Sequence, residues 1–189
     1  MPIVFGIDAG LTSPGFALIQ TDTDTLLFAE CFIPKSVNHG SKSDFNADRV
    51  GEIALRIAEL CDSWLPEVVI VELPTGGAKS AGAGRGMALS LATTVAALTL
   101  IAQQFAARGQ PLSLRWITPM ENKKGGLGLK KWISGADSKT LTLDAMTRLY
   151  PLAPWPMKKA KKNKPAVRDL PKCWAVADAL SCVVTYARR

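Results

Sequence analysis

The run VVIVEL at residues 68–73 constrains the fold more than any other part of the sequence. It is continuous, apolar and rich in β-branched residues, which is typical of a central strand covered on both faces. Three shorter β-rich runs precede it at residues 2–9, 15–20 and 25–33, and Gly, Pro, Ser, Asp and Thr separate them. We therefore expect three consecutive strands joined by hairpins, and then a buried strand.

Helical patterns fill most of the remaining chain. Apolar residues recur at helical spacing between residues 46 and 65, and a long Ala- and Leu-rich run covers residues 85–107. Proline and lysine are frequent in residues 151–164, where we expect a loop. The other expected elements are a strand at residues 112–118, a short helix at 138–150 and a final amphipathic helix at 173–189.

This order of elements is that of the ribonuclease-H-like layout, a mixed five-stranded α/β sheet (three antiparallel strands, then parallel ones) flanked by helices. With 189 residues, of which 48% are hydrophobic, we expect one such domain over residues 1–189. No apolar run is long enough to span a membrane, and MPIVFGID does not resemble a cleavable leader, so we expect a cytoplasmic protein. The four cysteines are widely spaced in apolar surroundings and are expected to be reduced core thiols.

Three acids occur where apolar elements would bury them. Asp8 ends VFGID, Glu72 ends VIVE, and Asp178 interrupts VADAL. If the first and fourth strands are neighbours, Asp8 and Glu72 project from adjacent strand ends, and a helix packed on the sheet brings Asp178 to them. Such carboxylates repel one another unless a divalent cation lies between them, which predicts a site for Mg²⁺, with Mn²⁺ as a substitute. A turn cap at Asp8, a lysine partner for Glu72 and a surface position for Asp178 remain alternatives.

The charge of the chain indicates a polyanionic partner. The net charge is +7, and lysines cluster at residues 123–131 and 158–164. Lysine runs are also common in solvated loops. Beside a carboxylate-bound cation, however, they suit phosphodiester hydrolysis, because the cation stabilises the reacting phosphate and the lysines hold its neighbours. Hydrolysis of nucleic acid is therefore the leading prediction.

Several segments resemble the RuvC-type Holliday-junction resolvases, in the order that this family has them. GIDAGLTSPGFALI is similar to the first motif of the family, and VVIVELP with GRGMALSLATTVAAL to the second motif and its following helix. The stretch WITPMENKKGGLGLKKWISGADSK resembles the region where a lysine-bearing loop contacts DNA. VADALSCVVTYARR resembles the terminal catalytic helix. The resemblance covers nearly the whole chain.

This resemblance implies a homodimeric, Mg²⁺-dependent endonuclease that binds four-way DNA junctions and nicks two strands symmetrically. Asp8, Glu72 and Asp178 would be its catalytic metal ligands. The regions that contact DNA in the family contain Lys79, Arg85, Lys123, Lys124, Lys130, Lys131 and Lys139. Which lysine pair of KKGGLGLKK corresponds to that of the family stays open.

The sequence departs from the family pattern at two places. A second acid or a histidine is expected one helical turn before Asp178, where this chain has Ala175. Asp169 is a poor substitute for this ligand, since nine residues of helix separate it from Asp178 by roughly 13 Å. Alternatively, a water fills the position, the natural residue was replaced to inactivate the protein, or the protein binds junctions without cutting them well. The loop after Glu72 also lacks the aromatic wedge of the family, which leaves Trp132 or Leu73 for strand opening.

Two other classes of protein compete with this interpretation. Actin-like ATPases and sugar kinases also carry an Asp-Gly turn near the N-terminus, but they need two such domains and more chain than 189 residues. A branched-DNA binding protein with impaired or absent cleavage fits both the positive charge and Ala175. Cleavage of a synthetic junction discriminates between that protein and the nuclease.

Overall fold

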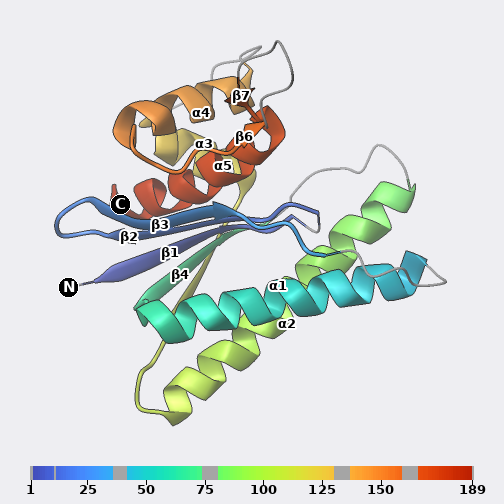
Figure 1. Ribbon diagram of the computed structural model, residues 1–189. Helices are drawn as coiled ribbons and strands as arrows, with labels where there is room; N and C mark the ends of the chain where they lie inside the picture. The colour runs from blue at the N-terminus through green and yellow to red at the C-terminus, as the bar shows by residue number, and fades with distance from the viewer. Residues whose placement is uncertain are drawn as a thin grey trace.

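A mixed β-sheet lies between two layers of helices in the computed structural model (Figure 1). The structure describes residues 2–10, 12–35, 42–73, 81–129, 137–158 and 166–188, and of residues 42–47, 81–87, 89, 90 and 93 it describes the backbone alone. None of the helices in these segments is long and apolar enough to cross a membrane.

The five strands of the main sheet follow the order β3-β2-β1-β4-β5. The first three strands are antiparallel neighbours, whereas β4 runs parallel to both β1 and β5. The predicted adjacency of the first and fourth strands is therefore confirmed. Their bounds are β1 Ile3–Asp8, β2 Gly15–Gln20, β3 Thr25–Cys31, β4 Val68–Glu72 and β5 Ser113–Ile117.

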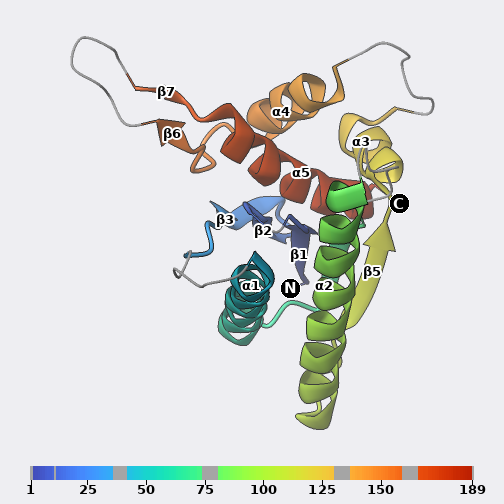
Figure 2. The same cartoon turned by 90° about the vertical axis from the view of Figure 1, so that its right-hand side faces the viewer.

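The helices divide between the two faces of the sheet, as Figures 1 and 2 show. The helices α1 Lys42–Trp64 and α2 Ala81–Ala107 cover one face, and α5 Leu170–Ala187 crosses the other. Outside α5 lie α3 Pro119–Leu127, α4 Ser138–Leu149 and a two-stranded ribbon of β6 Met157–Lys158 and β7 Val167–Arg168.

Alternate residues of each strand enter two separate cores. Phe5 and Phe16 face α1 and α2, where Ile57 and Leu98 complete a core of large side chains. The core on the opposite face contains the intervening strand residues and the buried side of α5. The sheet is thus covered on both faces, as the unbroken run of β4 predicts.

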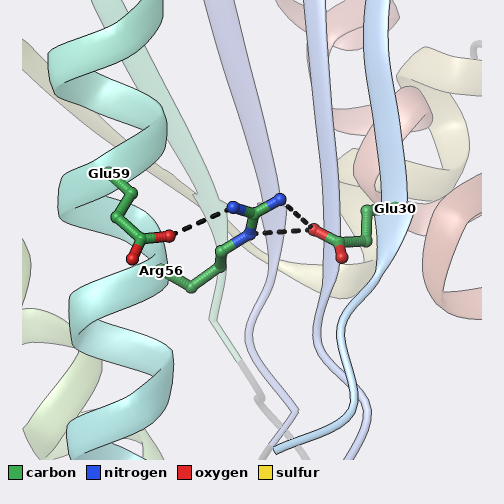
Figure 3. A network of polar contacts seen from close by, with 3 residues as sticks. All are labelled: Glu30, Arg56 and Glu59. Carbon is green, nitrogen blue, oxygen red and sulfur yellow. Dashed lines mark hydrogen bonds and ion pairs between the residues drawn. The ribbon is translucent and has the colours of Figure 1, made fainter.

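An ion-pair network ties α1 to the edge strand β3 (Figure 3). Arg56 donates from Nε and Nη2 to Oε2 of Glu30, at 3.0 and 2.9 Å, and from Nη1 to Oε2 of Glu59 at 3.1 Å. The guanidinium carbon also lies 5.6 Å from the ring centroid of Phe28. This network therefore lies at the rim of the face, outside the core.

The helix α5 approaches the sheet closely enough to exclude side chains from two strand positions. A Cβ added at Gly15 would overlap the carbonyl oxygen of Ala175, and one added at Gly6 would overlap that of Ala179. Glycine at these positions lets the helix backbone rest directly on β1 and β2. The position of α5 relative to the strand ends is consequently fixed by backbone contact.

The sequence-based expectations differ from the structure mainly after β5. The region expected as a lysine-bearing loop contains the helix α3, so Lys123 and Lys124 lie on a helix. Thr118 and Glu121 cap that helix reciprocally, since each side chain accepts a hydrogen bond from the other residue's backbone N–H. The expected loop at 151–164 contributes one strand to the ribbon, and α5 begins three residues earlier than expected.

The cysteines agree with the expectation of core thiols. All four are free, and Cys61, Cys173 and Cys182 are buried whereas Cys31 is half-buried. Burial raises the pKa of Cys31 to about 11 and that of Cys61 to about 12. These thiols are therefore protonated near neutral pH.

Candidate active site

Asp8 and Glu72 lie side by side at the ends of parallel strands. They are register partners in the pairing of β1 with β4, and both are half-buried. Neighbouring strands of a sheet are about 4.8 Å apart, so the two carboxylates lie next to each other where the strands end. The strand residues before each acid are buried, which places the site directly on the core.

Asp178 reaches this point from the helix that crosses the sheet. It is the half-buried residue in a continuous run of buried positions of α5, between Ala175–Ala177 and Ala179–Thr185. Because the backbone of α5 rests on Gly6 and Gly15, the helix carries Asp178 to the ends of the strands. The charges of Asp178 and Glu72 both act on Asp8, so the structure brings the three predicted acids within electrostatic reach of one another.

Burial and mutual repulsion oppose the simultaneous ionisation of these acids. Burial is the largest cause that raises the pKa of Asp8 well above its ordinary value, followed by the charges of Asp178 and Glu72. Burial likewise raises the pKa of Glu72, and burial with the Glu72 charge raises that of Asp178 to about 7. Positive charge beside these three acids would therefore favour their ionised forms.

Two lysines supply part of that charge from separate helices. Lys123 of α3 and Lys139 in the first turn of α4 each lower the pKa of all three acids. Lys139 is exposed, and its Nζ lies 4.8 Å from the ring centroid of Trp174, which precedes Ala175 on α5. Asp137 caps α4 and accepts hydrogen bonds from the backbone of Lys139 and Thr140, which fixes where this helix starts.

The other predicted DNA-contact residues cannot all be placed. Lys124 is half-buried in the last turn of α3. Lys79, Lys130, Lys131 and Trp132 lie outside the described residues, as does the side chain of Arg85. Leu73, the other residue considered for strand opening, is half-buried, and its backbone N–H bonds the carbonyl of Ile117.

Asn122 contacts the acids, and the sequence analysis missed it. It lies on α3 and is fully buried, and its Nδ2 donates to Oε2 of Glu72 and, at 3.0 Å, to the backbone carbonyl of Asp178. The capping pair Thr118 and Glu121 is a sequence signal that predicts the helix around it. No local signal distinguishes this asparagine from one on the surface.

The position expected for a fourth ligand serves packing instead. Ala175 is 5% exposed, and its carbonyl oxygen faces Gly15 across the contact between helix and sheet. Asp169 precedes the first turn of α5, where its carboxylate pairs with Lys172 at 3.3 Å. The structure thus gives Asp169 a partner of its own.

The acids suit a hard divalent cation in their chemistry. They offer only carboxylate oxygens, and burial, together with repulsion at Asp8 and Asp178, raises their pKa values, a cost of ionisation that a bound cation would offset. Across the described part of the chain, no three His, Cys, Asp or Glu side chains are gathered closely enough to hold a metal ion as they stand. The metal site itself therefore stays a prediction.

Comparisons with known proteins identify the fold. No family model matches the sequence, and no curated protein matches it. Thermus thermophilus RuvC in complex with a Holliday junction substrate superposes with a TM-score of 0.62 at 20% identity, over 99% of this chain and 93% of that one. Another structure of Thermus thermophilus RuvC gives 0.59 at 20% identity, over 98% and 93% of the two chains.

A third similar structure is the yeast mitochondrial Holliday junction resolvase Ydc2. Its TM-score is 0.62 at 11% identity, over 98% of this chain and 77% of that chain. Identities this low establish a shared fold. The chain thus has the mixed-sheet, ribonuclease-H-like fold of the RuvC-type resolvases, which confirms the predicted fold class.

Proposed function

We propose that this protein is a structure-selective endodeoxyribonuclease that binds four-way DNA junctions and hydrolyses their phosphodiester bonds with Mg²⁺ or Mn²⁺. The observation that carries the proposal is the electrostatically coupled group of the acids Asp8, Glu72 and Asp178 with Lys123 and Lys139, where β1 and β4 of a resolvase-like fold end. One of the similar structures is a RuvC bound to a Holliday junction substrate, which supports this class of DNA.

In this mechanism the acids hold the cation and the lysines hold the DNA. Asp8, Glu72 and Asp178 would bind the cation through their carboxylates. A cation bound there supplies Lewis-acid stabilisation of the phosphate and lowers the pKa of an attacking water. Lys123 and Lys139 add positive charge beside the reacting group and attract the flanking phosphates.

Gly10 supports close approach of the DNA backbone. A Cβ added at Gly10 would find its nearest neighbour, the Ser13 carbonyl oxygen, at 3.6 Å, and its φ is not in the left-handed region. The fold therefore does not require glycine two residues after Asp8. We attribute this glycine to the passage of a phosphate next to Asp8, where a side chain would stand in the way.

The homodimer is part of the same proposal. The residues Ala88, Ala92, Ala96 and Leu100 recur every four positions along α2, and all four are exposed. Such a stripe of small and apolar residues on one helix supports packing against a second copy of the helix. Two copies would supply two acid clusters for two nicks.

Cleavage of a synthetic four-way junction tests the proposal. Asp8→Asn should abolish nicking in Mg²⁺ or Mn²⁺ and preserve or tighten binding in a gel-shift assay, because it removes negative charge near the phosphate. Asp22→Asn makes the same change at an exposed acid and should leave nicking and binding as in the parent. Nicking by Asp8→Asn at the parent rate would overturn the assignment of the acids.

Ala175 favours a second candidate, a junction-binding protein that does not cut. The same assay separates the two functions when Ala175→Asp and Ala175→His are added, with thermal denaturation to verify folding at this buried position. If the parent and both folded variants shift the junction but never nick it, the binding function replaces the nuclease.

A further inference from the structure

Asn122 joins two of the three acids through one amide group. Both hydrogens of Nδ2 are used, one on Oε2 of Glu72 and the other on the backbone carbonyl of Asp178. Asn122 is fully buried, and its Oδ1 is buried as well, without a hydrogen-bond partner among the described residues. Burial of an unpaired amide oxygen is unfavourable, so packing alone does not explain an asparagine here.

Among the described residues, the contact with Asn122 engages Oε2 of Glu72 and leaves Oε1 without a hydrogen bond. A glutamate side chain rotates readily about its last bond, and each rotation changes which oxygen faces a bound ion. The Asn122 amide holds Oε2 and thereby fixes the plane of the carboxylate. Oε1 is the oxygen that remains for a cation.

The backbone of Asn122 is anchored as firmly as its side chain. Its carbonyl oxygen accepts hydrogen bonds from the hydroxyls of Ser181 and Thr185 on α5, each at 3.0 Å. Gly125 and Gly126 bring α3 against the same two residues, since a Cβ at either glycine would overlap them. Contacts between α3 and α5 therefore hold the backbone that carries this amide in place.

We propose that Asn122 is a positioning residue that sets the affinity of the acid cluster for its divalent cation. It orients Glu72, and it ties the helix of Lys123 to the helix of Asp178. It does so without charge, as a fourth and neutral member of a cluster that already has three acids. This inference rests on the proposed function, because it concerns the cation of that same site.

The direct test is a titration of the intact protein with Mn²⁺, in which electron paramagnetic resonance measures the concentration of the free ion. Asn122→Ala and Asn122→Leu remove both amide hydrogens and should weaken Mn²⁺ binding by about 10-fold or more, as loss of a residue that orients a metal ligand does. Ser181→Ala is the matched control, because it removes one hydrogen bond from Asn122 but leaves its contact with Glu72. It should bind Mn²⁺ within about twofold of the parent.

Nicking assays give a second measurement for the same variants. The Mn²⁺ concentration for half-maximal nicking should rise in Asn122→Ala by the same factor as the dissociation constant, and the rate at saturating Mn²⁺ should recover toward the parent value. A residue with a merely structural role would instead lower the saturating rate, and would do so in Ser181→Ala as well. That result would overturn the inference.

Asp8→Asn separates failure of this inference from failure of the proposed function. If the parent does not bind Mn²⁺, or binds it equally well after Asp8→Asn, the proposed function fails and the inference fails with it. If the parent binds Mn²⁺ in an Asp8-dependent way and folded Asn122→Ala binds it within about twofold, only the role of Asn122 is overturned.

Discussion

The two faces of the sheet are packed in different ways. The face toward α1 and α2 is filled by large side chains, among them Phe5, Phe16, Ile57 and Leu98. On the other face the backbone of α5 rests on two glycines of the strands. The first arrangement packs large side chains between helices and sheet, and the second fixes the distance between helix and sheet.

This difference separates stability from the placement of the acids. Large interdigitating side chains contribute most of the hydrophobic stabilisation and tolerate small shifts of a helix. Backbone contact leaves no such freedom, and the acid on α5 must meet acids that end two strands. We infer that the α1/α2 face supplies stability through side-chain packing, and that the α5 face adds to its own buried core the backbone contacts that fix the geometry.

Ile57→Ala should give the largest loss of stability. The side chain is fully buried against the sheet, so its removal leaves a cavity and should lower the free energy of unfolding by about 3 kcal/mol. Urea denaturation measures this loss, and Leu55→Ala at an exposed position of the same helix should change stability by less than about 0.5 kcal/mol. Nicking per folded molecule should stay at the parent level; a tenfold loss would show that the two faces are not separable.

Gly15→Ala should cost less stability and remove more activity. The added Cβ pushes the backbone of α5 off β2, which should destabilise the fold by about 2 kcal/mol and displace Asp178. Gly51→Ala is the matched control, since no atom lies near its added Cβ and alanine should stabilise the helix by about 1 kcal/mol. Parent-like stability and nicking in Gly15→Ala would contradict the idea that backbone contact positions the acid.

Much of this geometry is predictable from the sequence. The runs VFGID and VIVE each bury a strand and end on an acid, so parallel neighbours bring Asp8 and Glu72 together. The three acids and the fold class follow from such local patterns. The contact that fixes α5 does not, because a glycine in a strand does not specify which residue will face it.

The helix α3 was not predicted, because the residues that pack against its glycines cannot be identified from the sequence either. Gly125 and Gly126 lower its intrinsic helix propensity, and their use becomes apparent only where α5 lies against them. The role of Asn122 depends on the same docking of two helices distant in sequence. Ala175 was identified as a missing ligand, whereas in the folded chain it lies against Gly15.

Asp178→Asn should stabilise the protein when no divalent cation is present. The folded pKa of Asp178 is raised to about 7, so its stability contribution falls as the pH rises from the unfolded pKa near 4 toward 7. The variant should be more stable than the parent at pH values above about 7, by on the order of 1 kcal/mol, and less stable than the parent below about pH 4, where the parent carboxyl is neutral and the buried amide of the variant still loses hydration.

Thermal denaturation in EDTA across this pH range measures the difference. Asp144→Asn, at an exposed position of α4, makes the same change outside the cluster and should show no such pH dependence. A parent as stable as Asp178→Asn at every pH would mean that neither burial nor repulsion opposes ionisation of Asp178, and the contrast between the two faces would then rest on packing alone.

The smallest effect is expected at the polar rim of the α1/α2 face. Arg56 and Glu30 are about as exposed as each other, at 28% and 31% for their side chains, so water screens their attraction. Arg56 also contacts Glu59 and Phe28, so a single substitution of Arg56 overstates the free energy of its interaction with Glu30. A double-mutant cycle with Arg56→Met and Glu30→Gln isolates it, and we expect a coupling of about 0.5 kcal/mol in urea denaturation.

Salt dependence sharpens this last comparison. The Arg56–Glu30 coupling should largely vanish at about 1 M salt, where the Debye length is about 3 Å, because both groups reach solvent. The contact between Asn122 and Glu72 involves a fully buried partner, and a cycle with Asn122→Ala and Glu72→Gln should keep its coupling at that salt concentration. An Arg56–Glu30 coupling free energy above about 2 kcal/mol that persists at high salt would mean that a specific polar contact stabilises the face that we assign to hydrophobic packing.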